Sequence, residues 1–595
     1  MSLSNLETWV KSQGGKWTQN VSFSTIAENN FGAVYSSDTP SNVSIEVPTQ
    51  CIIKLSDAVK HLGNEFESIC RQTRNINCVT KLFLVRERSP AYLDKSQFKP
   101  YIETLPSMRA INSPYVWAAE EKACLQGSNL GSSLRQNIGE LIEEWWLVIS
   151  LLPESVAKPD NHFLNMKFYY EHKFYTEADL AAYVTEDNHS NWTSFASYLW
   201  ASMIMKSRAF PSYLLKECLT TVDALDVAQE DVTMLIPVVD LLNHNPKALV
   251  SWGGASGLFK FESHDDYSRG DQVFNNYGQK GNEELLLAYG FCIENNPADS
   301  VVLKIKVPEE LLPELEKNGV QLPSLSDYTT SVVHSAAKVE DKQAVHKDGL
   351  LFFISKDRVP ENLVLVFQWL VKSKWEGEKL TLRMKLSGLN HLRQALESKT
   401  QLLDVNRANG ASNEINIKIY LKGQKKLLEG GVKKVKHLEK ELLAENKGKL
   451  LSLKTVYKRD IKFAQSLLVT MGVTSYEDIL LEQLLDQVWL LYLIRCYNRK
   501  EFVKSEEDEE ENYLPEWITK CFERMDQEID IPAAEVLQFR ELYENLILPM
   551  NQAVPEIYNV GQWTVRQLIV STKVMDTIGF VRGKEQECIL VNDFE

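Results

Sequence analysis

The stretch VVDLLNHNPKALVSW, residues 238–252, places polar side chains where an apolar run indicates burial. Val238 and Val239 are followed by an acid, two leucines and then Asn243 and His244. A buried amide or imidazole costs a few kcal/mol unless it has a hydrogen-bond partner. Asn243 and His244 therefore each need a partner if this segment is buried.

Length and composition indicate a folded protein of two or three domains. The chain has 595 residues, of which 44% are hydrophobic and 10% aromatic, enough to build substantial cores. No apolar run approaches the ~18 residues of a membrane span. The first fifteen residues lack the basic and apolar regions of a secretory signal. We therefore expect no membrane association and a cytoplasmic protein, with the nucleus as the alternative compartment.

Cysteine usage and charge exclude several classes of protein. The nine cysteines are scattered without a C-x-x-C pair or a Cys/His cluster, which argues against a disulfide framework, a structural zinc site and any other metal. The net charge of −16 opposes binding to nucleic acid and favours a basic protein partner. Solubility alone explains the charge about as well.

The spacing of apolar residues changes along the chain between a strand pattern and a helical pattern, and this predicts an α+β protein. Residues 1–60 contain short β segments between turns, residues 61–225 are helical, and residues 226–310 are β-like again. This order indicates one β domain interrupted by a helical insertion. Residues 311–595 are helix-rich and charged, with an acidic loop expected near 505–512.

Two leucine- and valine-rich stripes predict helix faces that point into the core of the C-terminal half. The stripes consist of Leu386, Leu389, Leu392 and Leu396, and of Val432, Val435, Leu438 and Leu442.

Three motifs carry the chemistry: SRAF (207–210), DLLNH (240–244) and VFNNYGQKGNEELLLAYGF (273–291). Each alone is more often a helix end, a turn or a loop. Together, in this order and after a glycine-containing β turn, they resemble the SET-domain protein-lysine methyltransferases. The resemblance is to the subclass with a helical insertion, which includes the Rubisco large-subunit methyltransferase. It covers residues 20–310, and the part after residue 330 resembles the substrate-binding domain of that subclass.

Four segments are similar to fungal ribosomal-protein lysine methyltransferases: SRAFP, PVVDLLNH, NNYGQKGNEELL and LPSLSDYTT (322–330). The resemblance implies a monomeric enzyme that uses S-adenosylmethionine and methylates a lysine of a large-subunit ribosomal protein. Two alternatives stay open: another basic protein, such as a cytochrome or an elongation factor, as the substrate, or an inactive SET-domain interaction scaffold.

The resemblance also implies a pseudoknot, in which the segment matching NNYG threads past the segment matching DLLNH. Asn243 and His244 would then lie beside a neighbouring strand whose backbone supplies their partners. Tyr277 matches the active-site tyrosine and would orient the attacking amine; whether it also takes a proton is open. The implied cofactor contacts are Asn29, Asn30, Phe31, Arg208, Asp240, Asn243, His244 and Tyr277.

One departure from the family lies in the N-terminal turn AENNFGAV (27–34). Asn30 stands where the family has the first glycine of the loop, while Gly32 is retained. Asparagine visits left-handed backbone conformations more readily than most residues, so we expect the loop to be preserved.

The walls of the expected lysine channel are Phe210, Val239, Tyr289 and Phe291. A related branch that methylates a histidine of actin has Asn and Trp where this chain has Phe210 and Val239. An apolar wall at these positions offers no amide to an imidazole, so the resemblance implies lysine as the methyl acceptor.

Overall fold

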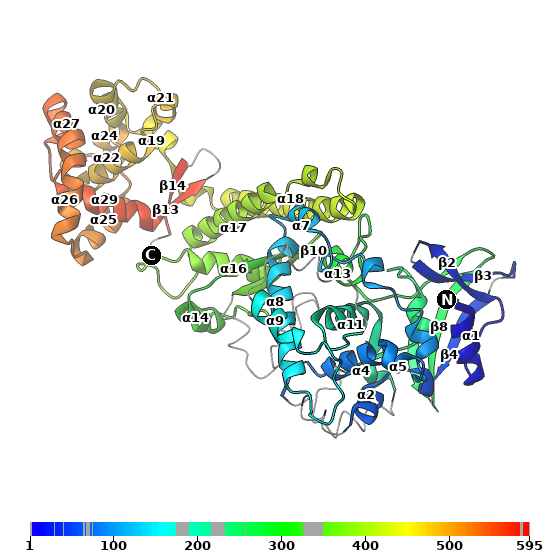
Figure 1. Ribbon diagram of the computed structural model, residues 1–595. Coiled ribbons are helices and arrows are strands. Elements are labelled where there is room, and N and C mark those ends of the chain that lie inside the picture. The colour runs from blue at the N-terminus through cyan, green and yellow to red at the C-terminus, as the bar shows by residue number, and fades with distance from the viewer. Residues whose placement is uncertain are drawn as a thin grey trace. The chain divides into compact units, whose positions relative to one another are not determined.

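The computed structural model (Figure 1) describes residues 3–28, 30–39, 41–63, 66, 69, 72–73, 75–173, 190–215, 232–255, 257–324, 349–356, 358–582 and 587–593. Asn29 and residues 325–330, the greater part of LPSLSDYTT, lie outside them.

The chain forms two compact units. The first contains Met1–Lys306, Pro323–Lys356 and Lys399–Leu428. The second contains Val307–Leu322, Asp357–Ser398 and Glu429–Glu595. No helix among the described residues combines the length and apolarity that crossing a bilayer requires.

Strands from both ends of the first unit's sequence join in shared antiparallel sheets (Figure 1). The four-stranded sheet has the order β1 (Lys16–Trp17), β4 (Ser41–Pro48), β8 (Leu258–Tyr267) and β7 (Val250–Ala255). A three-stranded sheet has the order β2 (Val21–Ala27), β3 (Asn30–Tyr35) and β9 (Gln272–Val273). Smaller pairs join β5 (Ala209–Pro211) to β6 (Thr233–Leu235), and β10 (Ser300–Ile305) to β11 (Leu350–Ser355). Strands from early and late parts of the sequence thus pair with one another in the same sheets. Together with the helices, they confirm the predicted α+β class.

Helices fill the sequence between these strands. They include α2 (Leu55–Leu62), α4 (Cys78–Arg88), α5 (Pro90–Leu93), α6 (Lys99–Ile102), α7 (Ala119–Ala123), α8 (Asn129–Ser150), α9 (Leu164–His172) and α11 (Phe195–Arg208). Ser128 and Ser194 cap α8 and α11 by accepting a hydrogen bond from a backbone N–H of the first turn. Helix α11 ends at Arg208, so SRAF lies at a helix end as predicted, and Pro211 falls in the strand that follows.

Two helices that begin within residues 1–60 were not predicted. These residues were expected to form short β segments between turns, but helix α2 begins at Leu55, and Leu3–Ser12 form helix α1, which buries Leu6 and Val10. Two buried positions four residues apart lie on one helix face, a signal too short to stand out in the sequence.

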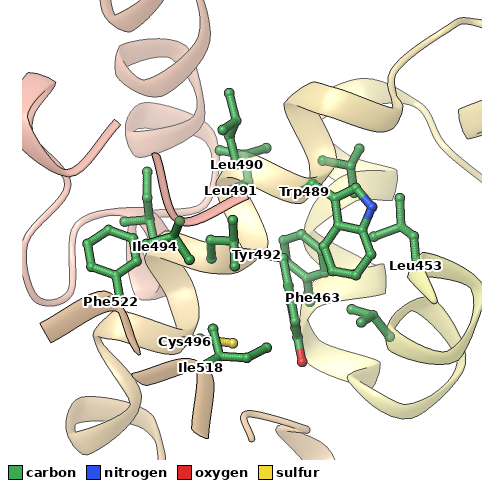
Figure 2. Packing of buried hydrophobic residues seen from close by; sticks show 14 of the residues in the cluster. Leu453, Phe463, Trp489, Leu490, Leu491, Tyr492, Ile494, Cys496, Ile518 and Phe522 are labelled. Atoms are coloured by element: carbon green, nitrogen blue, oxygen red, sulfur yellow. The ribbon is translucent and has the colours of Figure 1, made fainter. Parts of the chain in front are cut away.

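The second unit is mainly helical, with a small sheet of order β12 (Leu450–Ser452), β14 (Glu587–Val591) and β13 (Gly579–Arg582). Its core is built around α20 (Ile461–Met471), α22 (Leu485–Tyr497), α25 (Glu516–Glu528) and α29 (Val565–Ile578). Figure 2 shows the apolar side chains of α22 between those of its neighbours, with Trp489 and Tyr492 toward Phe463 and Ile494 toward Phe522.

The two predicted stripes have different outcomes. The four leucines of the first stripe lie in α17 (Leu382–Leu402) and are all buried, which confirms that stripe. In α18 (Glu414–Glu445) Val432 and Val435 are buried, but Leu438 is 37% exposed. Leu442 is partly buried and packs against the core cluster that contains Leu382 and Leu386, so the second stripe is right except at Leu438.

The acidic segment near 505–512 is not a loop. Residues Glu506–Glu511 form the short helix α24, which Ser505 and Asp508 begin with a reciprocal capping box. Carboxylates in the first turn are favourable at the positive end of the helix dipole, and this offsets part of their mutual repulsion.

Candidate active site

The DLLNH and NNYG segments lie side by side, although His244 and Tyr277 are 33 positions apart in the sequence. His244 and Asn275 form a parallel bridge. The Asn275 N–H donates to the Asn243 carbonyl (2.8 Å), and the Asn245 N–H donates to the Asn275 carbonyl (2.9 Å). This pairing brings the imidazole of one segment against the phenol of the other.

The side chains of Asn243 and His244 both hydrogen-bond to backbone groups, which supplies the partners that the sequence analysis requires. The Asn243 amide Nδ2 donates to the carbonyl of Phe31 (3.2 Å). The Tyr277 backbone N–H donates to His244 Nδ1 (3.0 Å), which must therefore be unprotonated. A Cβ on Gly32 would lie 3.2 Å from Asn243 Nδ2 and 2.6 Å from the Gln272 side chain, so this close approach favours glycine.

The environment of His244 predicts a pH dependence of stability. Burial lowers the pKa of the imidazole to about 4, with a further lowering from Lys280. Between pH ~6.5 and ~4 the unfolded chain then binds a proton that the folded chain does not, so the free energy of unfolding should fall as the pH drops through this range. Because His244 is partly exposed, we expect a loss of about 1–2 kcal/mol.

The measurement is chemical denaturation of the wild type and of His244→Asn between pH 7.5 and 4.5. The asparagine oxygen can replace Nδ1 as acceptor but does not titrate. The variant should lose less stability than the wild type on acidification. Equal losses would show that His244 does not titrate differently in the two states.

A strained turn leads into the site. Val238 has φ 72° and ψ −48°, and the Val239 N–H donates to the carbonyl of Pro237 (2.8 Å) across it, which is the geometry of a γ-turn. A β-branched residue in this conformation is an outlier, and such strain persists only where the surroundings fix it. The turn sets the direction from which Asp240 enters the site.

Asp240 is the centre of a buried polar cluster. Arg208 Nη1 donates to its carboxylate Oδ2 and to its backbone carbonyl, both at 3.1 Å. The Tyr101 hydroxyl, from helix α6, donates to the same Oδ2 (2.8 Å). Burial raises the pKa of the Asp240 carboxyl, while Arg208 and Tyr101 act in the opposite direction.

An aromatic stack continues from His244. The Tyr277 ring lies 4.9 Å from the imidazole of His244 and 4.7 Å from the Tyr289 ring, both nearly parallel, and Phe291 contacts Tyr289 edge-on at 6.3 Å. The Tyr277 hydroxyl donates to the Leu242 carbonyl (2.8 Å). Burial raises the pKa of the Tyr277 phenol far above its usual value, so it keeps its proton near neutral pH.

Tyr289 is held in place by the ends of helix α13 (Asn282–Tyr289). At the start, the Asn282 side chain exchanges hydrogen bonds with the backbone of Ile293 (2.8 and 3.0 Å). At the end, Gly290 adopts φ 78°, and a Cβ there would lie 2.6 Å from the carbonyl of Asn112. Only glycine suits a left-handed cap at such close approach.

These elements surround a cavity of about 390 Å³. The cavity is lined by Met205, Lys206, Ser207, Arg208, Ala209, Phe210, Pro211, Thr233, Asp240, Trp252, Asn275, Tyr277, Lys280, Glu284, Leu287, Ala288 and Tyr289. No group of three or more potential metal ligands occurs among the residues that the structure describes.

Five of the predicted site residues line the cavity: Arg208, Phe210, Asp240, Tyr277 and Tyr289. None of the other predicted residues that the structure describes lines it. His244 stacks against Tyr277, Asn243 bonds to the Phe31 carbonyl, Phe291 contacts Tyr289 from outside the cavity, and Val239 is fully buried.

The N-terminal turn is described only from Asn30 onward, because Asn29 lies outside the described residues. Asn30 begins strand β3, and the preservation of the whole loop stays a prediction. Phe31 contributes its carbonyl to Asn243, as a backbone contact in this loop would require.

Most of the residues that line the cavity were not predicted from the sequence, among them Asn275 and Trp252, and neither was Tyr101 beside Asp240. Asn275 is 1% exposed, and its side-chain oxygen accepts from Trp252 Nε1 (3.1 Å). Trp252 in turn packs edge-on against Phe210, with 5.5 Å between ring centres. Asn275 could have been found as the first residue of NNYG, whereas nothing in the sequence marks Trp252 or Tyr101 as a site residue.

Comparison with known proteins gives the class. A solved structure of Rubisco LSMT bound to AdoMet matches with a TM-score of 0.52 at 19% identity, over 74% of this chain and 93% of that chain. A second, the SET domain of LSMT bound to lysine and AdoHcy, matches with a TM-score of 0.51, also at 19% identity and the same coverages. The fold is therefore that of a SET domain.

Comparison of sequences gives the family. Ribosomal lysine N-methyltransferase 1 of Saccharomyces cerevisiae is 32% identical over 76% of this chain and 80% of its own length. Protein-lysine N-methyltransferase EFM1 of the same yeast is 28% identical over 99% of this chain and 97% of its own length, and the family described as the EFM1 middle domain matches residues 300–446. The chain belongs to the family of SET-domain protein-lysine N-methyltransferases.

Proposed function

We propose that this enzyme transfers a methyl group from S-adenosylmethionine to a protein lysine within the cavity lined by Arg208 and Tyr277. The observation that carries the proposal is the convergence of these two side chains on one cavity from segments far apart in the chain. The structural relatives bound to AdoMet and to AdoHcy support the choice of methyl donor.

The residues present fit the amino-acid end of S-adenosylmethionine. Arg208 lines the cavity, and only its Nη1 bonds to described protein groups, which leaves its remaining donors for a carboxylate. Asp240 Oδ1 is buried and has no hydrogen-bond partner among the described residues. When bound, S-adenosylmethionine supplies a methyl group on a sulfonium, which needs no further activation of the leaving group.

Tyr277 is suited to orient the reacting groups rather than to remove a proton. Its hydroxyl hydrogen is directed to the Leu242 carbonyl, so the lone pairs of the oxygen are available to other groups. Because burial keeps the phenol neutral, it offers an acceptor without a competing charge. Holding the two reactants in line supplies several kcal/mol of the barrier.

The attacking amine must be neutral, and the cavity favours that form. Phe210, Trp252, Leu287 and Tyr289 give it apolar walls, which disfavour an ammonium by desolvation. A neighbouring sulfonium disfavours it further, because the two charges are alike.

Phe210 should decide between lysine and histidine as the acceptor. It is 6% exposed and packs against the rings of Trp252 and Phe259 at 5.5 and 6.0 Å, so it forms a closed apolar wall. Phe210→Asn opens this wall and introduces an amide that can bond to an imidazole. We expect lysine methylation to fall at least about tenfold and methylation of a matched histidine peptide to become detectable. Phe210→Leu, which keeps the wall apolar, is the control; an unchanged lysine-to-histidine ratio in Phe210→Asn would contradict the assignment.

A ribosomal protein is the first candidate substrate. Two relatives bear that substrate in their names: ribosomal lysine N-methyltransferase 1, and set10 of Schizosaccharomyces pombe, which is 25% identical over 68% of this chain. The net charge of −16 is complementary to the basic proteins of the ribosome.

A different protein substrate is the second candidate. The relative that matches over almost the whole chain, and the family matching residues 300–446, carry the EFM1 name, which specifies no ribosomal protein. The deciding experiment incubates the purified enzyme and labelled S-adenosylmethionine with ribosomes and, separately, with the ribosome-free soluble fraction of cells that lack the gene. Label on a large-subunit protein supports the first candidate, and label only in the soluble fraction supports the second.

A further inference from the structure

The ion pair between Arg208 and Asp240 is one-sided. Arginine and a carboxylate commonly form two parallel hydrogen bonds. Here Nη1 alone contacts Asp240, at its Oδ2 and its backbone carbonyl. Arg208 Nε and Nη2 have no hydrogen bond to any described residue, and Asp240 Oδ1 is buried without a partner in the same part of the chain. The guanidinium therefore contacts one carboxylate oxygen through one nitrogen, and the usual bidentate pair is not formed.

Tyr101 is the group that accounts for this geometry. It belongs to the short helix α6 of the helical insertion, is 0% exposed, and donates its hydroxyl to Asp240 Oδ2 at 2.8 Å. Burial raises the pKa of the Tyr101 phenol well above its usual value, so it remains a donor. Asp240 Oδ2 therefore accepts hydrogen bonds from both the Tyr101 hydroxyl and Arg208 Nη1, and these two bonds fix the rotation of the carboxylate. Without the hydroxyl, the carboxylate can turn so that both its oxygens take the guanidinium.

We propose that Tyr101 is a positioning residue that keeps one edge of the Arg208 guanidinium free for the carboxylate of S-adenosylmethionine. It acts through Asp240 and does not itself touch the ligand. This inference rests on the proposed function and adds a residue of the helical insertion to the cofactor site.

The test is the binding of two nucleosides to the full chain, measured by calorimetry. S-adenosylhomocysteine carries the amino-acid group, whereas 5′-methylthioadenosine lacks it. Tyr101→Phe should weaken S-adenosylhomocysteine about tenfold, which is the effect of one lost hydrogen bond to a charged group, and should change 5′-methylthioadenosine less than about twofold. In an Asp240→Asn background, Tyr101→Phe should cost nothing more, because the residue through which it acts is already altered.

Tyr198→Phe is the matched control. Tyr198 is also buried, and its hydroxyl donates to the Glu144 carboxylate at 2.5 Å, so this variant loses the same kind of bond on helix α11 without touching Asp240. Both variants are compared at equal folded fraction, read from their melting curves. Equal weakening of both nucleosides by Tyr101→Phe, or the same loss in Tyr198→Phe, would assign Tyr101 a purely structural role and overturn the inference. Wild-type chain that fails to bind S-adenosylhomocysteine would overturn the proposed function, and the inference with it.

Discussion

Tyr277→Phe is expected to lower kcat for lysine methylation by roughly two orders of magnitude or more, with little change in the affinity for S-adenosylmethionine. The variant keeps the ring, which stacks between His244 and Tyr289 at 4.9 and 4.7 Å, so the cavity should keep its shape. It removes the hydroxyl that bonds to the Leu242 carbonyl from a side chain that lines the cavity. Single-turnover kinetics with saturating donor separate this loss from binding.

The control for Tyr277→Phe is Tyr267→Phe. Tyr267 is buried in strand β8 of the same unit and shares a hydrogen bond of 2.7 Å with Ser263, but it does not line the cavity. Its loss should leave kcat within about twofold of the wild type. A Tyr277→Phe enzyme that retains most of its kcat would show that the phenol is not part of the reacting centre.

Asp460→Ala should destabilise the second unit by about 3–5 kcal/mol. Asp460 and Arg495 form a two-point ion pair at 3.0 and 3.1 Å, and both side chains are 0% exposed. Arg495 Nη1 already lacks a hydrogen-bond partner among the described residues. Among the described residues, removal of the carboxylate leaves the buried guanidinium with its hydrogen bond to Asn512 and its contact with the Phe502 ring. It also removes the cap that Asp460 gives helix α20.

Chemical denaturation of the full chain, followed by the fluorescence of its tryptophans, measures this change. Glu523→Ala breaks the exposed pair with Lys500, which are 36% and 80% exposed, and should alter stability little. The double replacement Asp460→Leu/Arg495→Met should recover part of the loss, because it leaves no uncompensated charge. An Asp460→Ala chain as stable as the wild type would mean that the buried pair contributes nothing to the fold.

The sequence predicted the parts of the site that a local pattern marks. DLLNH carries polar residues that must find partners if buried. Its pairing with NNYG through Asn243 and Asn275, which the structure shows, was implied by the family resemblance and by no local pattern. The end of a helix at SRAF was also predictable, because the residue before Pro211 avoids the helical conformation.

The remainder depends on tertiary geometry that no local pattern contains. Tyr101 lies 139 positions from Asp240 and reaches it only because helix α6 packs there. Val238 adopts its strained turn because Pro237 and the following segment enforce it, although its own preference opposes that conformation. Leu438 fits the helical stripe but is 37% exposed, although Val435 before it is buried and Leu442 after it packs against the core.

The central claim is that Arg208 and Tyr277 enclose one methyl-transfer centre for lysine. The most direct measurement is acid hydrolysis of protein labelled by the enzyme from methyl-labelled S-adenosylmethionine, followed by amino-acid analysis, for the wild type and Tyr277→Phe. The account predicts label in ε-N-methylated lysine for the wild type and its near absence for the variant. Label in methylhistidine, or lysine label that persists undiminished without the Tyr277 hydroxyl, would contradict it.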